Sequence, residues 1–223
     1  MASEHKRAAG ERALDYVKDG MVLGLGTGST VYYTLQKLGR LVQEGLNIQG
    51  IPTSKATEEM ARELKIPLTD FVRHPVLDIT IDGADAVTPK LELIKGGGGA
   101  LLREKLVASA SKRMIVIIDE SKQVESFDNL DIPVEVIPFA VETTVERIRA
   151  LGGTPVLRER GESLFVTDNG HYIVDVKFPS VVDVAGLHDT LKRLTGVVET
   201  GLFPDLASHV IVGTEHGVRE LDR

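Results

Sequence analysis

The sequence predicts an α/β protein with a Rossmann-like parallel-sheet domain and a second, smaller ferredoxin-like α+β domain. Three observations carry this prediction. In residues 1–122, short apolar runs alternate with amphipathic helical patterns, as in a parallel sheet that helices cover on both faces. The residues that follow show a split β-α-β pattern, typical of ferredoxin-like domains. A last apolar run, His209 to Val212, is expected to return to the first sheet. We therefore expect domains at 1–127 with 206–223, and at 128–205.

The first domain contains apolar runs of the length of short buried strands. We expect these strands at residues 21–25, 48–51, 77–81, 91–94 and 114–118. Helical spacing follows most of them. Val31, Leu35 and Leu38, for example, recur on one helical face. We expect a first helix after Ser3, a plausible N-cap, with Ala9, Ala13, Tyr16 and Val17 on one face. The other expected helices cover residues 31–42, 55–65 and 100–110.

The second domain shows a different order of elements. We expect its strands at residues 132–137, 155–157, 164–166, 172–176 and 197–200, and its helices at 141–151 and 184–194. Asp168, Asn169 and Gly170 form a hairpin turn signal between two of these strands. One short strand is additional to the six elements of the ferredoxin-like pattern.

Composition excludes several classes of function. The chain of 223 residues has no cysteine, which removes disulfides, thiolate zinc sites and cysteine nucleophiles. The formal net charge of −7 argues against a nucleic-acid partner. No apolar run is long enough to cross a bilayer, so no membrane partner is expected. Residues 1–18 are charged and lack the apolar core of a signal peptide. We therefore expect a cytoplasmic protein.

Polar or glycine-rich segments directly follow five of the expected strands. They begin at Gly26, Thr53, Asp82, Lys95 and Asp119. If these strands are parallel, their carboxyl ends lie along one edge of the sheet, where ligands of open α/β sheets bind. The five segments would then form one candidate site.

The segment Gly26, Thr27, Gly28, Ser29 and Thr30 has the residue types of a phosphate-binding loop. Glycines let the backbone approach an anion, and the start of the following helix favours negative charge. The segment equally fits a tight turn with Ser or Thr caps, and it lacks the third glycine of the dinucleotide fingerprint.

Asp82, Asp85 and Lys95 are candidates for acid–base and charge-stabilising roles. Paired acids at a strand end can move protons or hold hydroxyls, although such an acid also often caps a turn. Four glycines follow Lys95 and offer no side-chain packing, which favours a backbone that wraps a ligand over a core segment. Lys95 at the head of this run could neutralise an oxyanion.

Glu104 lies about one turn into the helix after the glycines, and it can lean back toward them as a general base. An acid there also stabilises a helix by itself, and the pattern alone favours that structural role. We expect Arg103 and Lys105 to point elsewhere into solvent. Lys122 could reach a phosphate, although an exposed lysine is common in loops.

Histidines do not indicate a metal site. They lie at positions 5, 74, 171, 188, 209 and 216, without close ligand spacing. A magnesium ion at Asp82 and Asp85 would have Lys95 as a cationic neighbour. We therefore favour a site without a metal.

These residues resemble the ribose-5-phosphate isomerases of the A type over essentially the whole chain. The resemblance rests on the order of Gly24 to Thr30, Pro52-Thr53-Ser54 with Thr57-Glu58, Asp82-Gly83-Ala84-Asp85, Lys95 to Ala100 before Arg103-Glu104-Lys105, Thr200 to Phe203 and Val210 to Gly213. It implies interconversion of ribose 5-phosphate and ribulose 5-phosphate in the non-oxidative pentose phosphate pathway, through an enediol-type intermediate. It also implies that no metal or organic cofactor is needed, and that the chain forms a homodimer or homotetramer.

The resemblance assigns a role to each candidate residue. Glu104 is the base, Asp82 and Asp85 handle hydroxyl protons and ring opening, and Lys95 stabilises the oxyanion. The implied substrate contacts are Gly26, Thr27, Gly28, Ser29, Thr30, Gly96, Gly97, Gly98 and Lys122. Ala86 departs from the acidic or polar residue of many relatives, which leaves substrate preference at the pocket rim open.

Three other functions are weighed against this one. A coenzyme A transferase relative would use Glu104 as a nucleophile. A sugar-phosphate sensor would bind without catalysis, but the first expected strand begins by Met21 and leaves no room before the sheet for an output domain. A nucleotide-dependent dehydrogenase is disfavoured by the missing third glycine.

Overall fold

The computed structural model describes residues 2–223, which divide into two compact units. The first unit contains the described residues up to Ala84, Arg103–Gln123 and Leu206–Arg223. The second unit contains Asp85–Leu102 and Val124–Asp205. These bounds differ from the expected domains, because residues 85–102 and 124–127 group with the second unit.

The first unit is built on an open sheet. Among the described residues its six strands, in spatial order, are β15 (Gly217–Asp222), β14 (Ala207–Thr214), β6 (Met114–Asp119), β3 (Ile79–Gly83), β1 (Val22–Leu25) and β2 (Gln49–Pro52). All neighbouring pairs from β14 to β2 are parallel, and β15 pairs antiparallel with β14. The α/β class and the return of the chain at His209 are thus confirmed. Strand β15 was not predicted, because its side chains are largely polar and exposed.

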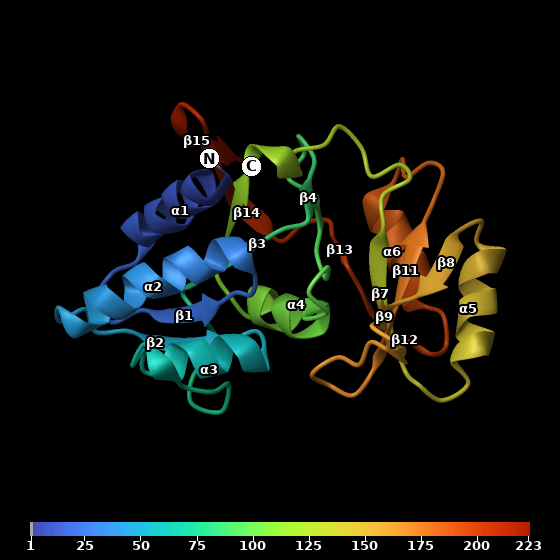
Figure 1. Cartoon of the computed structure of the whole chain (residues 1–223), viewed down its shortest axis with the longest axis horizontal. Coiled ribbons are helices and arrows are strands. Elements are labelled where there is room, and N and C mark those ends of the chain that lie inside the picture. The colour runs from blue at the N-terminus through green and yellow to red at the C-terminus, as the bar shows by residue number, and fades with distance from the viewer. Residues whose placement is uncertain (1) are drawn as a thin grey trace. The chain divides into compact units, whose positions relative to one another are not determined.

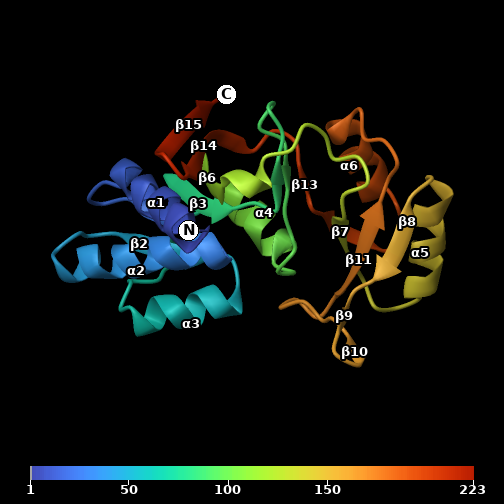
Figure 2. The same ribbon diagram turned by 45° about the horizontal axis from the view of Figure 1, so that its top comes forward.

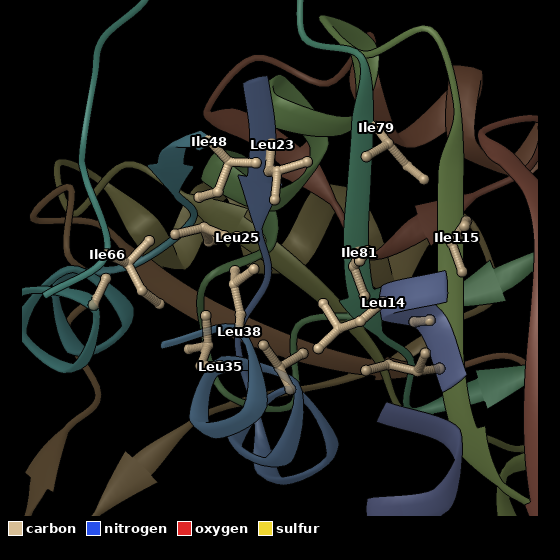
Figure 3. Close-up of a cluster of buried hydrophobic side chains, with 14 of the residues drawn as sticks. Leu14, Leu23, Leu25, Leu35, Leu38, Ile48, Ile66, Ile79, Ile81 and Ile115 are labelled. Atoms are coloured by element: carbon tan, nitrogen blue, oxygen red, sulfur yellow. The ribbon is translucent and has the colours of Figure 1, made fainter. Parts of the chain in front are cut away.

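Helices cover both faces of this sheet. They are α1 (Ala2–Arg12), the 3₁₀ turn η1 (Ala13–Tyr16), α2 (Ser29–Gln43), α3 (Lys55–Glu63), α4 (Leu101–Ser109) and the 3₁₀ turn η2 (Glu120–Lys122). Figure 1 shows α1 and α2 lying side by side, and both pack on the strands. The main core joins α1, α2 and α3 to one face of the sheet, with Ala9 of α1 and Ala61 of α3 among its members. Figure 3 shows leucines and isoleucines of η1, α2 and the strands in this core. On the other face, Val107 of α4 packs with Val22 and Ile51.

A polar network ties the start of the chain to the last two strands. The Glu220 carboxylate accepts hydrogen bonds from the Tyr16 hydroxyl at 2.6 Å and from Arg12 Nε at 2.6 Å. His209, which is buried, lies 2.9 Å from Glu220 and 2.6 Å from Asp222. The Tyr16 hydroxyl, then Arg12 and His209, lower the pKa of Glu220 from 4.5 to about 2. The carboxylate form therefore stabilises the folded state.

We expect Glu220→Gln to destabilise the protein in a pH-dependent way. A lowered pKa in the folded state contributes stability above pH 4.5 that is lost as the pH falls toward 2. The carboxylate is 24% exposed, so solvent screening reduces the contribution to about 1–2 kcal/mol. Urea unfolding of both proteins at pH 7 and at stepwise lower pH measures the difference. A difference that stays constant from pH 7 to pH 2.5 would contradict the assignment.

The second unit contains an antiparallel sheet with two helices. In spatial order the strands are β12 (Val197–Thr200), β7 (Ile132–Val136), β11 (Tyr172–Lys177) and β8 (Thr154–Leu157). Helices α5 (Val141–Ala150) and α6 (Val184–Lys192) supply Ile148 and Leu191 to the core that covers this sheet. With chain order β-α-β-β-α-β and spatial order 4-1-3-2, this is the predicted ferredoxin-like arrangement. The additional strand is half of a hairpin, β9 (Glu159–Arg160) with β10 (Ser163–Leu164), which extends from β8 and β11 in Figure 2.

The strand expected at residues 91–94 is not part of the parallel sheet. Strand β5 (Leu93–Ile94) pairs antiparallel with β4 (Ala86–Val87) and with β13 (Leu202–Phe203). Ala86, Ile94 and Leu202 also pack into the core of the second unit. These pairings explain why residues 85–102 group with the second unit.

Among residues 2–223, no helix is long and apolar enough to span a membrane.

Candidate active site

The predicted site residues are divided between the two units. The first unit carries the segment 26–30 with Asp82, Glu104 and Lys122. The second unit carries Asp85, Lys95, Gly96, Gly97 and Gly98. Of the five segments expected to converge, those that begin at Gly26, Thr53, Asp82 and Asp119 lie at the carboxyl ends of the neighbouring parallel strands β1, β2, β3 and β6. The expectation is wrong for Lys95, because β5 belongs to the separate antiparallel sheet.

The carboxyl ends of β1 and β3 form the switch point of the first sheet. From β1 the chain connects to β2 on one side and then to β3 on the other. At this point the Gly26 amide donates to Ile81 O at 3.0 Å, and the Thr27 amide donates to Asp82 Oδ1 at 3.0 Å. Asp82 is fully buried, and its Oδ1 also accepts the Gly83 amide at 2.8 Å. The structure therefore joins two of the predicted segments directly, where open α/β sheets bind ligands.

Two glycines in this loop are required by its geometry. A Cβ on Gly26 would lie 2.3 Å from Asp82 Oδ1 and 2.6 Å from Asp82 Cα. Gly28, at the N-cap of α2, has a φ of 118°, which L side chains rarely adopt. The loop thus depends on glycine for close approach at one position and for backbone conformation at the other.

We expect Gly26→Ala to lower kcat/KM by about 10²-fold, because the new methyl group displaces Asp82 and the Thr27 amide. Overpacking should also cost about 1–3 kcal/mol of stability. Gly20→Ala is the control, since Gly20 has a φ of 82° but open space around it. That variant should lose stability without losing kcat/KM. Steady-state kinetics and urea unfolding on both variants test this, and wild-type kinetics of Gly26→Ala would contradict it.

Side-chain hydroxyl groups from the end of β2 and the start of α3 form hydrogen bonds with the loop at Gly26 and Thr27. The Thr27 hydroxyl lies 2.7 Å from that of Thr53, 2.8 Å from that of Ser54 and 3.0 Å from that of Thr57. Thr57 also donates to Gly26 O at 2.8 Å, and Ser54 caps α3 by accepting the Thr57 amide. Ser54 is thus the N-cap of α3, while Thr53 and Thr57 bond to the loop itself.

The start of α2 is suited to binding an anion. Its first-turn amides have no acceptor within the helix, and Gly28 has no side chain to cap them. Ser29 is exposed, and Lys6 Nζ of α1 donates to its hydroxyl at 3.0 Å. Lys6 was not predicted, because a lysine 23 positions before Ser29 forms no sequence motif with it. It adds a positive charge beside the predicted loop.

Lys122 ends the short 3₁₀ turn η2 after β6, the neighbour of β3. Asp119 caps this turn, since its Oδ1 accepts the Ser121 amide at 3.0 Å. Lys122 is half-buried. The turn holds this lysine at the carboxyl-end edge of the same sheet.

Glu104 lies in the first turn of α4, as predicted, and is only 4% exposed. The expectation that Lys105 is solvated is wrong, because it is 9% exposed. Leu101, Val107 and Ala108 are buried as well, whereas Leu106 is 58% exposed. A carboxylate as buried as that of Glu104 differs from an ordinary solvated helix acid, since glutamate is rarely buried to this degree.

The second unit organises its residues around the glycine loop. Gly97 donates its amide to Asp85 Oδ2 at 2.7 Å, and a Cβ on Gly97 would lie 2.8 Å from Asp85 Oδ1. Lys95 is 2% exposed; its amide donates to Gly201 O at 2.8 Å and its ammonium lies 5.8 Å from the centre of the Phe203 ring. Backbone pairing of β5 with β13 and β4 therefore positions the neighbouring residues Asp85, Lys95 and the glycines.

No group of three or more histidine and carboxylate side chains in the described part of the chain is arranged to hold a metal ion.

A doubly wound sheet with an anion-binding helix start and a buried carboxylate at its switch point is the arrangement of an α/β enzyme. The family model of ribose 5-phosphate isomerase A (phosphoriboisomerase A) matches residues 49–217. The chain belongs to this family.

Individual relatives agree with this assignment. Ribose-5-phosphate isomerase A of Bacillus mycoides is 52% identical over 216 residues, which cover 96% of this chain and 98% of that one. A probable ribose-5-phosphate isomerase 2 of Arabidopsis thaliana is 48% identical and covers 97% of this chain and 85% of its own. The structure of ribose 5-phosphate isomerase A from Methanocaldococcus jannaschii superposes with a TM-score of 0.95 at 38% identity, covering both chains completely. A D-ribose-5-phosphate isomerase in complex with phospho-erythronic acid superposes with a TM-score of 0.96, also at 38% identity and complete coverage of both chains.

Proposed function

We propose that this protein is an aldose–ketose isomerase that interconverts D-ribose 5-phosphate and D-ribulose 5-phosphate in the non-oxidative pentose phosphate pathway. The observation that carries the proposal is the hydrogen bond from the Thr27 amide to the buried carboxylate of Asp82. Thr27 directly precedes Gly28, the N-cap of α2, and the start of this helix is suited to binding an anion. Such a loop can hold a phosphate beside an acid that handles sugar hydroxyls. Family membership and a relative bound to phospho-erythronic acid support the same substrate class.

The proposed phosphate contacts are Gly26 to Thr30 and Lys122. Small residues and free helix-start amides suit an anion, and the lysine adds a point charge. Binding energy from the phosphate then orients the sugar carbons, since remote contacts can be used to position the reacting centre.

The proposed chemistry moves one proton between neighbouring carbons. In the open-chain aldose, Glu104 takes the proton from C2, and the electron pair moves to the C1 carbonyl oxygen to give an enediolate. Lys95 stabilises the negative oxygen, with the amides of Gly96, Gly97 and Gly98 as further donors. Protonated Glu104 then delivers its proton to C1, the hydroxyl on C2 gives up its proton and becomes the ketone, and the negative oxygen on C1 takes up a proton and becomes a hydroxyl. Asp82 and Asp85 handle the hydroxyl protons and the preceding ring opening.

The test is isomerisation of ribose 5-phosphate by the purified protein with EDTA present. We propose that no metal or organic cofactor takes part, so EDTA should leave the rate unchanged. Turnover that EDTA abolishes would contradict the metal-free proposal. Tight binding of ribose 5-phosphate without turnover would instead support a sensor. A thioester trapped on Glu104 after incubation with an acyl coenzyme A would support a transferase.

We further propose that the protein acts in the cytoplasm as a homodimer or homotetramer with a small-molecule substrate. The second unit exposes large apolar side chains, with Phe139 85% exposed and Val182 90% exposed, as expected of a surface that a second subunit covers. Size-exclusion chromatography with light scattering should give a mass of two or four chains. A monomer at working concentration would contradict the proposal.

A further inference from the structure

The guanidinium group of Arg158 contacts the glycine loop of the second unit. Arg158 stands between β8 and β9, and its Nη1 donates to Gly96 O at 2.8 Å and to Gly97 O at 3.0 Å. Its other side faces Asp175 of β11, with Nε 2.8 Å from Oδ2 and Nη2 bonded to Oδ1. This two-point pairing with a carboxylate fixes the plane of the guanidinium. Arg158 therefore holds two consecutive carbonyl groups in a defined direction.

The peptide unit between Gly96 and Gly97 connects Arg158 to Asp85. Arg158 binds its carbonyl oxygen, and on the opposite side its amide donates to Asp85 Oδ2 at 2.7 Å. No cis peptide bond occurs in the described residues, so each carbonyl and the next amide point in opposite directions. A donor on the carbonyl also polarises the amide and strengthens the bond that it donates. The carboxylate of Asp85 is thus oriented through one peptide unit.

The next peptide unit follows the same geometry. Because Arg158 binds the Gly97 carbonyl, the Gly98 amide points to the other side of that peptide plane. Gly97 and Gly98 are exposed. Free glycines would sample many orientations of these amides. Arg158 restricts that freedom at both peptide units, and the Gly99 amide, which donates to Gly96 O at 2.9 Å, adds a second restraint at the first of them.

We propose that Arg158, held by Asp175, is a positioning residue for Asp85 and for the outward amides of the glycine loop. This inference rests on the proposed isomerase function, because it assigns Asp85 and these amides to the reaction. Arg158 has no assigned contact with the substrate and acts through the loop. Lysine cannot replace it, since one ammonium group cannot bind two carbonyls and pair at two points with Asp175.

The test compares Arg158→Lys with Arg160→Lys. Arg160 is the matched control, because its guanidinium lies 4.8 Å from the centre of the Phe165 ring, which Arg158 also approaches, at 5.7 Å. We expect Arg158→Lys to lower kcat by about 10- to 100-fold with little change in KM, since a misplaced group costs rate rather than binding. Arg160→Lys should keep wild-type kcat. Arg160→Lys should keep the wild-type urea midpoint, whereas Arg158→Lys should lower it, because hydrogen bonds of a largely buried pair are lost, and both variants should be folded under the assay conditions.

A second readout is independent of turnover. The NMR resonance of the Gly97 amide proton should lie downfield in the wild type, as a short bond to a carboxylate requires, and should move upfield in Arg158→Lys. In a double-mutant cycle, Asp85→Asn should remove most of the effect of Arg158→Lys on kcat. Wild-type kcat in Arg158→Lys, an unmoved Gly97 resonance or additive effects with Asp85→Asn would each overturn the inference. A wild type that binds but does not isomerise ribose 5-phosphate would refute the proposed function, and the Gly97 resonance would still test the positioning.

Discussion

Replacing Glu104 with glutamine is expected to lower kcat for ribose 5-phosphate isomerisation by about 10²- to 10⁴-fold, the usual contribution of a positioned general base. Glutamine keeps the size and the hydrogen-bonding oxygen but cannot accept the C2 proton. Because the proposed phosphate contacts do not include Glu104, KM should change little. Steady-state kinetics of the wild type and the variant measure both constants.

Glu142→Gln is the matched control for this substitution. Glu142 is also an acid in the first turn of a helix, α5, but it is exposed. If both variants kept wild-type kcat, Glu104 would have only the structural role of a helix acid. Attention would then move to Asp82, which is equally buried and lies at the switch point.

Replacing Lys95 with methionine should lower kcat by roughly 10²- to 10³-fold, as expected for the loss of one preorganised oxyanion donor. Methionine fills a similar volume without charge. Lys95 is 2% exposed, so solvent would screen its charge weakly and its effect on a nearby oxyanion would be large. Steady-state kinetics should show the fall in kcat, and urea unfolding should show that the variant is folded under the assay conditions.

Lys112→Met is the control for the charge change. Lys112 pairs with Asp78 at 2.7 Å on the surface of the first unit and is 65% exposed. It should leave kcat unchanged. Equal kcat in Lys95→Met and the wild type would refute the oxyanion role, whereas equal losses in both lysine variants would indicate a general charge effect.

Continuous apolar runs in the sequence predicted the strands of the first unit well. These strands are buried on both faces of the sheet and are therefore apolar at nearly every position. The runs at 21–25, 77–81 and 114–118 therefore appear close to their expected bounds, as β1, β3 and β6. Residues 91–94 also form an apolar run but pair antiparallel in another sheet. Burial alone gives an apolar strand no direction and no partner, so the sequence could not assign it.

The site was predictable where glycine or acid chemistry appears in a local motif. Gly26 and Asp82 were candidates because each directly follows an expected strand. Glu104 was a candidate because it lies about one turn into the helix after the glycines, although the pattern alone favoured a structural role for it. Lys6 and Arg158 did not stand out, since their contacts join segments 23 and 62 positions apart. Hydrogen bonds between residues so far apart in the chain produce no spacing pattern that a single sequence could reveal.

The most direct test of the proposed chemistry is the fate of the C2 hydrogen in D₂O. Ribulose 5-phosphate formed by the wild type should carry solvent deuterium at C1, detected by NMR, because a carboxylate that holds the proton can exchange it before returning it. Glu104→Gln should slow isomerisation and exchange together. Rapid isomerisation by the wild type with protium alone at C1, or undiminished exchange in Glu104→Gln, would contradict proton transfer by Glu104.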